Sequence, residues 1–375
     1  MSGRLRVVIV GGGVGALETM LALHDLAGGR VDATLLSPET EFRYRPASVA
    51  LPFGRGQVHR FAISDAAAAA DTRHMPAALD RIDATEHLAF TDTDGTIPYD
   101  VSVIACGAQR VPALPGALVF RGEEDVDSMK ELLEGIDAGA VKRVIFAVPS
   151  TVSWQLPLYE LALLTATHVG ERRILGVKLE LVTPESRPLA EFGGDASTAV
   201  EQLLGELGIV VHTSTHPVRV HDRGLDVVPS GTLAADRVVS VPHARGVPIA
   251  GLPHDREGFL PVDDRGRVRG LDDMFAVGDV TDFPIKQGGI AAGQADLVAH
   301  IVARQAGAPL AEPPAARPVL RGLLITGGTP RYLFADPTGG HGETAEASTD
   351  PLWWPGGKIA AHHLGYYLAN APTLD

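Results

Sequence analysis

At 375 residues, with 45% apolar and 21% charged residues, the chain is long enough for two α/β domains and has the composition of a globular protein. Its formal charge of −14 would repel a phosphate backbone, and no basic tract interleaved with aromatic residues offsets that charge, which excludes nucleic acid as a partner. No apolar run approaches the roughly 20 residues that cross a membrane, and no signal segment precedes the first strand, so we expect a cytoplasmic protein without a transmembrane segment.

The first elements predict a βαβ unit. Residues 5–10 (LRVVIV) have the pattern of a buried parallel strand, the apolar spacing after Val14 is helical, and residues 31–36 (VDATLL) form the next strand. The turn between the first strand and the helix, GGGVGA, fills the G-x-G-x-x-G/A pattern. Its glycines let a diphosphate approach the backbone amides at the helix N-terminus, whereas the alternative is a turn that serves only close packing. The residues expected to hold a dinucleotide there are Gly11, Gly13, Val14, Gly15 and Ala16.

The acid that usually binds a ribose at the end of the second strand is displaced. Ser37 occupies its position, and Glu39 is the nearest carboxylate. Ser37 and Glu39 are therefore candidates for a hydrogen bond to a ribose hydroxyl, while Ser37-Pro38-Glu39 as a simple turn is the alternative.

A second alternation of strands and helices begins near Val141. Strands are expected at 141–148, 177–182 and 209–213, with helices from Trp154 to about His168 and at 196–207. Gly- and Pro-punctuated segments around these elements suit short antiparallel hairpins. The whole pattern predicts an α/β fold with two Rossmann-like domains and a C-terminal extension.

Two further segments resemble the FAD-dependent flavoproteins of the pyridine nucleotide-disulfide oxidoreductase superfamily. Residues 97–108 (IPYDVSVIACGA) are similar to its Y-D-x-L-V-I-A-T-G-A segment, with Cys106 in place of the usual threonine. Residues 274–280 (MFAVGDV) are similar to its second FAD motif. Residues 35–46 and 284–289 resemble one branch of it, which comprises the sulfide:quinone oxidoreductases, flavocytochrome c sulfide dehydrogenases and type II NADH dehydrogenases.

The resemblance implies FAD as the cofactor and a division into 1–110 and 241–308 (FAD domain), 111–240 (second Rossmann-like domain) and 309–375 (C-terminal segment). Asp279 would accept a hydrogen bond from a ribityl hydroxyl, with a helix N-cap as its alternative role. Lys286 would face the N1/C2=O edge of the flavin, with a solvated surface lysine as the alternative. The implied cofactor-binding residues are Gly11, Gly13, Val14, Gly15, Ala16, Ser37, Pro38, Glu39, Arg45, Pro46, Leu79, Ala105, Cys106, Gly107, Gly278, Asp279, Lys286 and Gln287.

Two features separate the chain from the usual chemistry of that branch. The turn after strand 141–148 is PSTVSW (149–154), whose proline and bulky side chains would obstruct a diphosphate and argue against ordinary NADH oxidation. The sulfide-oxidising families place a redox cysteine near the position of Trp154, whereas Cys106 is the single cysteine here. A disulfide or persulfide relay and a multi-thiolate metal site are excluded within one chain, and no metal site is predicted. We interpret Cys106 as a small buried apolar group rather than a redox thiol.

The C-terminal segment is expected to contain a strand at 329–334 and a short helix after residue 357. Ile359, His363, Leu364, Tyr367 and Leu368 would form one apolar face of that helix. With one lysine and no arginine it is poorly equipped for an anionic membrane, so packing on its own FAD domain or on a twin subunit is favoured over peripheral membrane contact.

These features predict an FAD-dependent oxidoreductase that moves electrons from a small reductant to an acceptor such as a quinone. The alternative is a non-enzymatic flavin-binding sensor, electron carrier or assembly partner. No catalytic acid or base is identified. The residues expected near the flavin are Tyr44, Trp154, Lys286 and Trp353.

Overall fold

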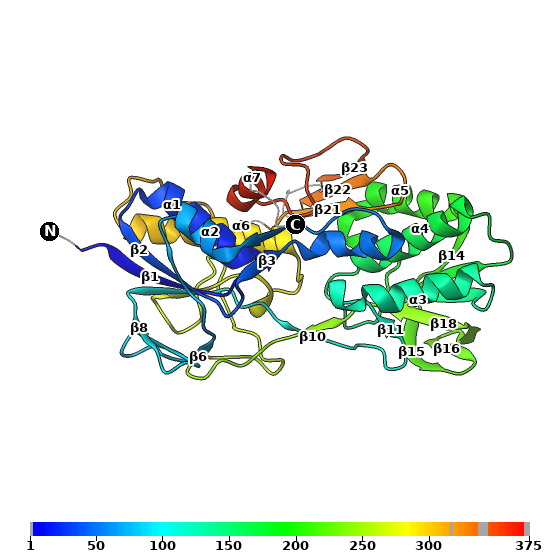
Figure 1. The fold of residues 1–375 in the computed structure, drawn as a ribbon, viewed down its shortest axis with the longest axis horizontal. Helices are drawn as coiled ribbons and strands as arrows, with labels where there is room; N and C mark the ends of the chain where they lie inside the picture. The colour runs from blue at the N-terminus through cyan, green and yellow to red at the C-terminus, as the bar shows by residue number, and fades with distance from the viewer. Residues whose placement is uncertain (1–2, 316–317, 337–343, 371–375) are drawn as a thin grey trace.

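A computed structural model describes residues 3–315, 318–336 and 344–370, and they form two lobes joined side by side (Figure 1). The first lobe is built on a five-stranded parallel sheet with the order β20-β9-β1-β2-β5. Strands that are neighbours in this sheet, such as β9 and β20, are far apart in the sequence, as in a doubly wound fold. The strands are β1 (Leu5–Val10), β2 (Val31–Leu36), β5 (Arg73–Met75), β9 (Val101–Ile104) and β20 (Met274–Ala276).

Both faces of this sheet are covered. Helices α1 (Val14–Ala27) and α6 (Gly288–Gln305) pack together on one face, through buried side chains such as Leu17 and Val298. On the other face, Val8 and Val10 pack against the small antiparallel sheet of β6 (Leu79–Asp83), β7 (Leu88–Thr91) and β8 (Thr96–Pro98). Burial on both faces explains why β1 is apolar at nearly every position.

The second lobe repeats this architecture. Its parallel sheet has the order β11-β18-β12-β13-β14, flanked by helices and by an antiparallel hairpin sheet. Two such sheets confirm the predicted α/β class, and the predicted elements of this lobe are found within a few residues of their expected bounds. The elements are β11 (Leu118–Val119), α3 (Val126–Asp137), β12 (Arg143–Ala147), α4 (Leu156–Glu171), β13 (Lys178–Val182), α5 (Gly193–Glu206), β14 (Ile209–His212), β15 (His216–His221), β16 (Gly224–Val228), β17 (Gly231–Ala234) and β18 (Arg237–Ser240).

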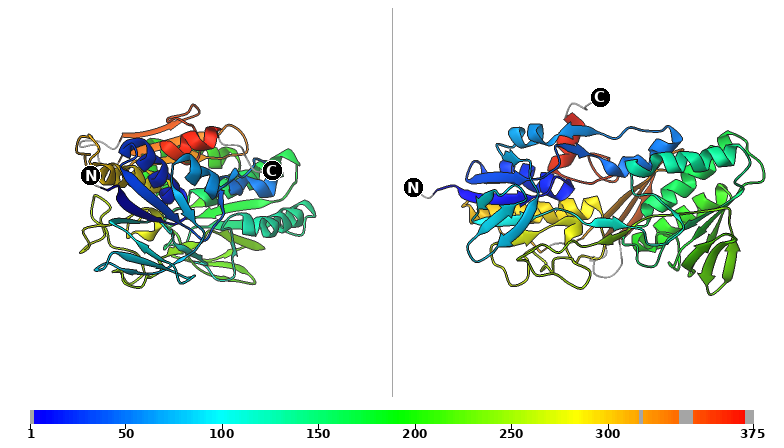
Figure 2. Two further views of the ribbon diagram at one scale, coloured as in Figure 1. Left: turned by 60° about the vertical axis from the view of Figure 1, so that its left-hand side comes forward. Right: turned by 60° about the horizontal axis from the view of Figure 1, so that its bottom comes forward.

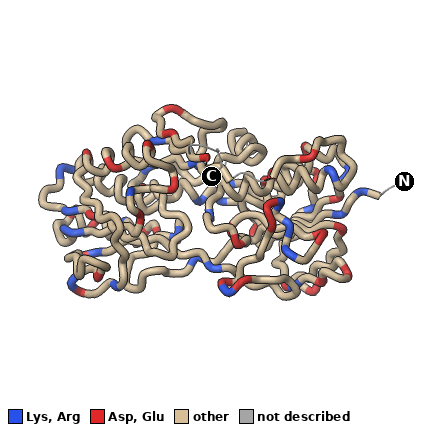
Figure 3. The backbone as a smooth tube through the Cα atoms, turned by 180° about the vertical axis from the view of Figure 1, so that it is seen from behind, with Lys and Arg blue, Asp and Glu red and all other residues tan. Residues whose placement is uncertain are grey.

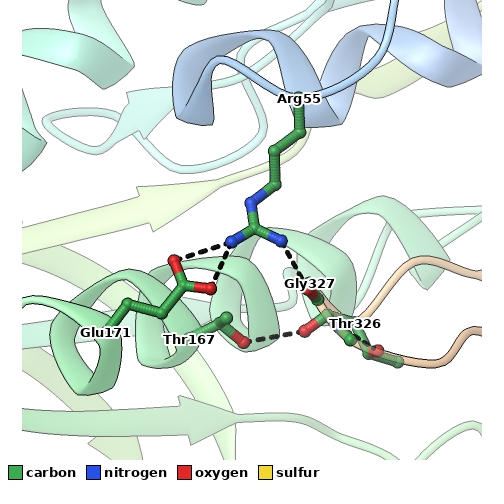
Figure 4. A network of polar contacts seen from close by, with 6 residues as sticks. Arg55, Thr167, Glu171, Thr326 and Gly327 are labelled. Atoms are coloured by element: carbon green, nitrogen blue, oxygen red, sulfur yellow. Dashed lines mark hydrogen bonds and ion pairs between the residues drawn. The ribbon is translucent and has the colours of Figure 1, made fainter.

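Two connections hold the lobes together. The chain passes between them through β10 (Gln109–Val111) and β19 (His243–Arg245), which pair antiparallel. A 3₁₀ segment, η1 (Arg45–Phe53), extends from the first lobe along α3 and α4 of the second. Just beyond it, Arg55 donates hydrogen bonds of 2.6 and 2.7 Å to the two carboxylate oxygens of Glu171 and another to the carbonyl of Gly327 (Figure 4).

The C-terminal segment lies across both lobes, as the views in Figure 2 also show. Its antiparallel sheet lies against α4 and α5, and α7 (His363–Asn370) packs on α1. The sheet strands are β21 (Leu320–Leu324), β22 (Arg331–Asp336) and β23 (Thr344–Ser348).

The expectation that Ile359 belongs to the last helix is wrong. Helix α7 begins at His363, because the carboxylate of Glu18 on α1 accepts hydrogen bonds of 2.8 and 2.6 Å from the amides of His363 and Leu364. Ile359 is buried before the helix, in a separate turn. Among the described residues, no helix is long and apolar enough to cross a membrane.

Candidate functional site

The carboxyl ends of β1, β2, β9 and β20 meet at one edge of the first sheet. The turn after β1 carries Gly11, whose φ of +125° and contact with Ala105 exclude a side chain, because a Cβ there would overlap the Ala105 carbonyl. Val277, the residue directly after β20, lies 3.0 Å from the position of a Cβ on Gly15, so the chain after β20 packs on the first turn of α1. Gly11 and Gly15 thus have a packing role in the turn.

The N-terminus of α1 is open. Gly13 is its N-cap, no side chain caps the helix, and nothing lies within 4 Å of a Cβ built on Gly13. The first amides of the helix, those of Val14 to Ala16, therefore lack intrahelical acceptors and point toward free space. This geometry fits an anionic diphosphate at the predicted turn.

Ser37 and Glu39 act together beside that turn. Ser37 is buried, and its hydroxyl donates a 2.7 Å hydrogen bond to the Glu39 carboxylate. Both side chains border Gly12, since a Cβ there would lie 2.5 Å from the Ser37 hydroxyl and 3.4 Å from Glu39. Glu39 lies two positions after the usual site of the ribose-binding acid, but its carboxylate is next to the turn, where a ribose hydroxyl could reach it. Pro38 lies between these two residues. Leu79, also predicted to contact the cofactor, is the first residue of β6, and its side chain is partly buried against the core.

Cys106 and Gly107 follow β9 at the same edge. Cys106 is a free and exposed thiol, and nothing lies within 4 Å of a Cβ on Gly107. The interpretation of Cys106 as buried is therefore corrected: its side chain opens on the space beside the turn. Surrounding protein nevertheless desolvates the thiol and raises its pKa to about 11, with a smaller contribution from Glu39. A protonated thiol is a poor nucleophile, which agrees with a non-redox role.

Asp279 lies in η4 (Gly278–Val280), directly after β20, and has no hydrogen-bond or ion-pair partner in the described part of the chain. Burial raises the pKa of its carboxyl, against the opposing charges of Lys286, Arg110 and Arg45. The N-cap alternative for Asp279 is wrong, because the side chain of Gln287 caps α6 by accepting a 2.8 Å hydrogen bond from the Ile290 amide. An unpaired carboxylate facing the site fits a ribityl hydroxyl donor.

A cavity of about 220 Å³ opens next to Asp279, between the two lobes. Arg45 and Pro46 at the start of η1 line it, as do Lys286 and Gln287 at the start of α6. The second lobe contributes Trp154 and the residues that follow it. The structure therefore brings together predicted residues from segments 45–46, 154, 279 and 286–287.

Lys286 is not a solvated surface lysine. Its ammonium group donates to the carbonyl of Thr281 and lies 3.8 Å from the centre of the Phe259 ring. Desolvation lowers its pKa to about 8, although Asp279 favours the charged form. A lysine with this pKa, at the wall of the cavity, can change its charge near neutral pH.

Of the other three residues expected near a flavin, Trp154 lines the cavity and Tyr44 and Trp353 do not. Tyr44 is buried outside the cavity wall, where its hydroxyl accepts a 2.7 Å hydrogen bond from the Ile359 amide, and burial raises its pKa to about 12. Trp154 lines the cavity and also packs edge-on against Phe192. Trp353 packs on Tyr332, donates to the Gly357 carbonyl and does not line the cavity.

Among the cavity residues that the sequence interpretation missed, three carry a charge. Arg110 on β10 and Arg121 approach from the passage between the lobes. Lys358 arrives from the C-terminal segment and forms a buried ion pair with Glu160, a fully buried residue of α4. Burial raises the pKa of Glu160, and Lys358 opposes that effect. Arg110 lies two residues after Ala108, the end of the segment that resembles the flavoprotein motif, but nothing local marks any of the three as a cavity residue.

At the corresponding edge of the second sheet several polar groups are bonded within the protein, although Ser153 and Trp154 there also line the cavity. After β12, the Val152 amide bonds to the Pro149 carbonyl, and the His243 ring lies 2.8 Å from the Thr151 carbonyl. Glu185, after β13, is where a ribose-binding acid is expected. Four donors already satisfy its carboxylate: Gln155, Tyr159, Thr183 and the Ala190 amide.

Charges are distributed over the whole molecule. Acidic and basic positions are interspersed on both lobes in Figure 3, rather than gathered in one basic stripe. Within the described ranges, no group of three or more His, Cys, Asp or Glu side chains could hold a metal ion.

Comparison with known proteins gives consistent results. A family model described as pyridine nucleotide-disulphide oxidoreductase matches residues 159–302. An NADH dehydrogenase-like protein of Mycobacterium tuberculosis is 30% identical over 298 residues, which cover 73% of this chain and 72% of that protein.

Solved structures share the fold at lower sequence identity. The sulfide:quinone oxidoreductase of Aquifex aeolicus has a TM-score of 0.81 at 21% identity and covers 92% of this chain and 87% of its own. A ferredoxin reductase of Rhodopseudomonas palustris has a TM-score of 0.64 at 18% identity, with 89% and 83% covered. NDH2 of Plasmodium falciparum has a TM-score of 0.58 at 16% identity, with 76% and 65% covered.

Proposed function

Because the chain belongs to the pyridine nucleotide-disulphide oxidoreductase family, whose members are oxidoreductases, we propose that it binds FAD and transfers electrons from a small reductant to an acceptor such as a quinone. The proposed reaction uses no disulfide or persulfide relay, because the chain has one cysteine. We propose the cytoplasm as the location of this activity. The observation that carries the proposed function is the uncapped, open N-terminus of α1 beside the unpaired carboxylate of Asp279.

Each part of the site has a proposed role toward FAD. The amides of residues 13–16 would hold the diphosphate, and Glu39, oriented by Ser37, would accept from the adenosine ribose. Asp279 would accept from a ribityl hydroxyl. Bound FAD would supply the two-electron chemistry.

The protein's own contribution would be charge and access. Lys286 places a cation at the start of α6, where the helix dipole adds positive potential. Lys358 places a second cation at the cavity wall and is held there by Glu160, so that it cannot swing into solvent. Lys286 would favour the additional negative charge of a reduced flavin, whereas the charge of Lys358 is offset by Glu160.

The protein–protein hydrogen bonds at that edge of the second sheet support a donor other than NADH. A dinucleotide diphosphate needs free amides at the turn after β12, and its ribose needs a free carboxylate. Here the Val152 amide is bonded within the turn, and the Glu185 carboxylate is satisfied by protein donors. The relative from Mycobacterium tuberculosis carries the name NADH dehydrogenase-like, so this point needs a direct test.

The test is an anaerobic titration of the purified protein, followed by its absorption spectrum. We expect a flavin spectrum, reduction by a small donor such as sulfide that is faster than reduction by NADH or NADPH, and re-oxidation by a soluble quinone. Asp279→Asn should lower the FAD content, whereas Asp264→Asn, an exposed aspartate without a described hydrogen-bond partner, should retain it. A wild-type protein that remains colourless after incubation with FAD would refute the proposal.

A further inference from the structure

The cavity between the lobes carries an excess of positive charge. Its lining includes five cationic side chains but a single acid, Asp279, although the chain as a whole has a net charge of −14. The cations are Arg45, Arg110, Arg121, Lys286 and Lys358.

Two of these cations form ion pairs with acids of the protein, and a third, Lys286, faces Asp279 without an ion pair. Lys358 is paired with the buried Glu160, and Arg121 lies 2.6 Å from the carboxylate of Asp125. Lys286 is the largest opposing charge on Asp279.

Arg45 and Arg110 have no such partner. Within the described residues, no carboxylate lies within 4.0 Å of either guanidinium. Arg110 donates to the carbonyl of Arg121, which leaves most of its five N–H donors for other acceptors. Burial, followed by repulsion from Arg45, lowers the pKa of Arg110, while Glu124 and Asp279 act in the opposite direction at longer range. A partly buried guanidinium with only a neutral acceptor is costly, and an anion would relieve that cost.

Bound FAD would not balance the positive charges of Arg45 and Arg110. This step rests on the proposed function: the diphosphate of FAD would lie at residues 11–16, and none of those residues lines the cavity. The isoalloxazine that would reach the cavity beside Asp279 carries no net charge when oxidised. The positive potential of Arg45 and Arg110 therefore remains for a second ligand.

The wall on the side of the second lobe is apolar. Phe120, Trp154 and Val241 form it together with neighbouring prolines. We propose that this cavity is a binding site for a small organic anion, with its apolar body against Phe120 and Trp154 and a carboxylate-type head on Arg110. Arg45 adds a second positive charge to the same site. The planar guanidinium fork of Arg110 suits the two oxygens of a carboxylate, which makes Arg110 the residue that selects an anionic ligand over a neutral one.

Benzoate and its neutral isostere benzamide test the proposal on the FAD-loaded protein. Calorimetry measures the binding, and a shift of the flavin absorption band reports that the ligand lies beside the flavin. Benzoate should bind at least about tenfold more tightly than benzamide, because hydrogen bonds to charged partners are about twice as strong as neutral ones. Arg110→Gln should remove this preference, and Arg110→Lys should retain part of it. Arg245→Gln is the matched control, because Arg245 is exposed on the neighbouring strand β19 and does not line the cavity.

Several outcomes would overturn the proposal. Equal affinities for benzoate and benzamide in the wild-type protein would show that the cavity does not select an anion, whatever the variants do. Loss of FAD from Arg110→Gln to the same extent as from Asp279→Asn would assign Arg110 to the cofactor instead. Both results leave the proposed flavin function intact, whereas a protein that cannot take up FAD fails at the earlier step and removes the basis of both.

Discussion

The buried ion pair between Glu160 and Lys358 gives a quantitative prediction. Glu160 is fully buried on α4 and also accepts a 2.8 Å hydrogen bond from the Ile325 amide, while Lys358 belongs to a segment almost 200 positions away. Lys358→Met leaves a buried carboxylate without its cation, a change that costs about 3–5 kcal/mol. With roughly 2.1 cal/mol/K of unfolding entropy per residue, 375 residues give about 0.8 kcal/mol/K, so Tm should fall by about 4–6 °C.

The assay is thermal unfolding at two pH values of Lys358→Met, Glu160→Gln, the double variant and the control Lys130→Met. Because Lys358 lowers the pKa of Glu160, its removal raises that pKa further above the unfolded value. The variant is then most stable where Glu160 is protonated, so the loss should be smaller at acid pH than at pH 8. Glu160→Gln/Lys358→Met, which removes both charges, should recover more than half of the loss. Lys130→Met, which breaks an exposed pair with Asp127, should leave Tm unchanged. A Tm shift below about 1 °C for Lys358→Met, or strictly additive losses in the double variant, would refute the reasoning.

Three further predictions concern the site and its support. Gly13→Val should retain the fold but lose bound FAD, because the new side chain enters only open space at the helix N-terminus. Gly11→Ala should lose FAD and also lower Tm, because its Cβ would overlap the Ala105 carbonyl. Measurements of FAD content and Tm distinguish the two variants. The midpoint potential of bound FAD should fall more steeply with pH above about 8, where Lys286 loses its charge, and a potential–pH curve of Lys286→Met should lack this break. Asp296 has a pKa raised to about 8 by burial and by Glu18, so stability should fall as pH rises from its ordinary value of 3.8 through about 8, and Asp296→Asn should lose this part of the pH dependence in a series of Tm measurements.

Elements with strong local signals were predicted from the sequence alone. Strands β1 and β2 and the start of α1 at Val14 have their expected bounds, because an apolar run next to a glycine turn specifies both elements within about 30 residues. The start of α7 was predicted wrongly, since the carboxylate of Glu18, more than 340 positions away, sets it. The assignment of individual residues to FAD stays a prediction.

The cavity could be predicted only in part, for the same physical reason. Asp279 and Lys286 belong to sequence motifs, and they do line it. Arg110, Arg121 and Lys358 become part of the site only through contacts made when the two lobes and the C-terminal segment pack together, and the partner of Lys358, Glu160, is almost 200 positions away. Contacts of that kind leave no periodicity or spacing from which they could be recognised.

The two halves of the molecule show how one fold can be used in two ways. At the edge of the first sheet, glycines leave an open helix N-terminus and Glu39 has one protein donor, so a ligand can complete the site. At the equivalent edge of the second sheet, the Glu185 carboxylate is bonded by four protein donors, and its stabilisation no longer depends on a ligand. Because buried polar groups require partners, Glu185 bonded in this way is a structural group whose carboxylate needs no ligand. The second lobe also supplies Trp154, which lines the cavity where the proposed flavin would meet its substrate, and the buried Glu160, which holds Lys358 at the cavity wall.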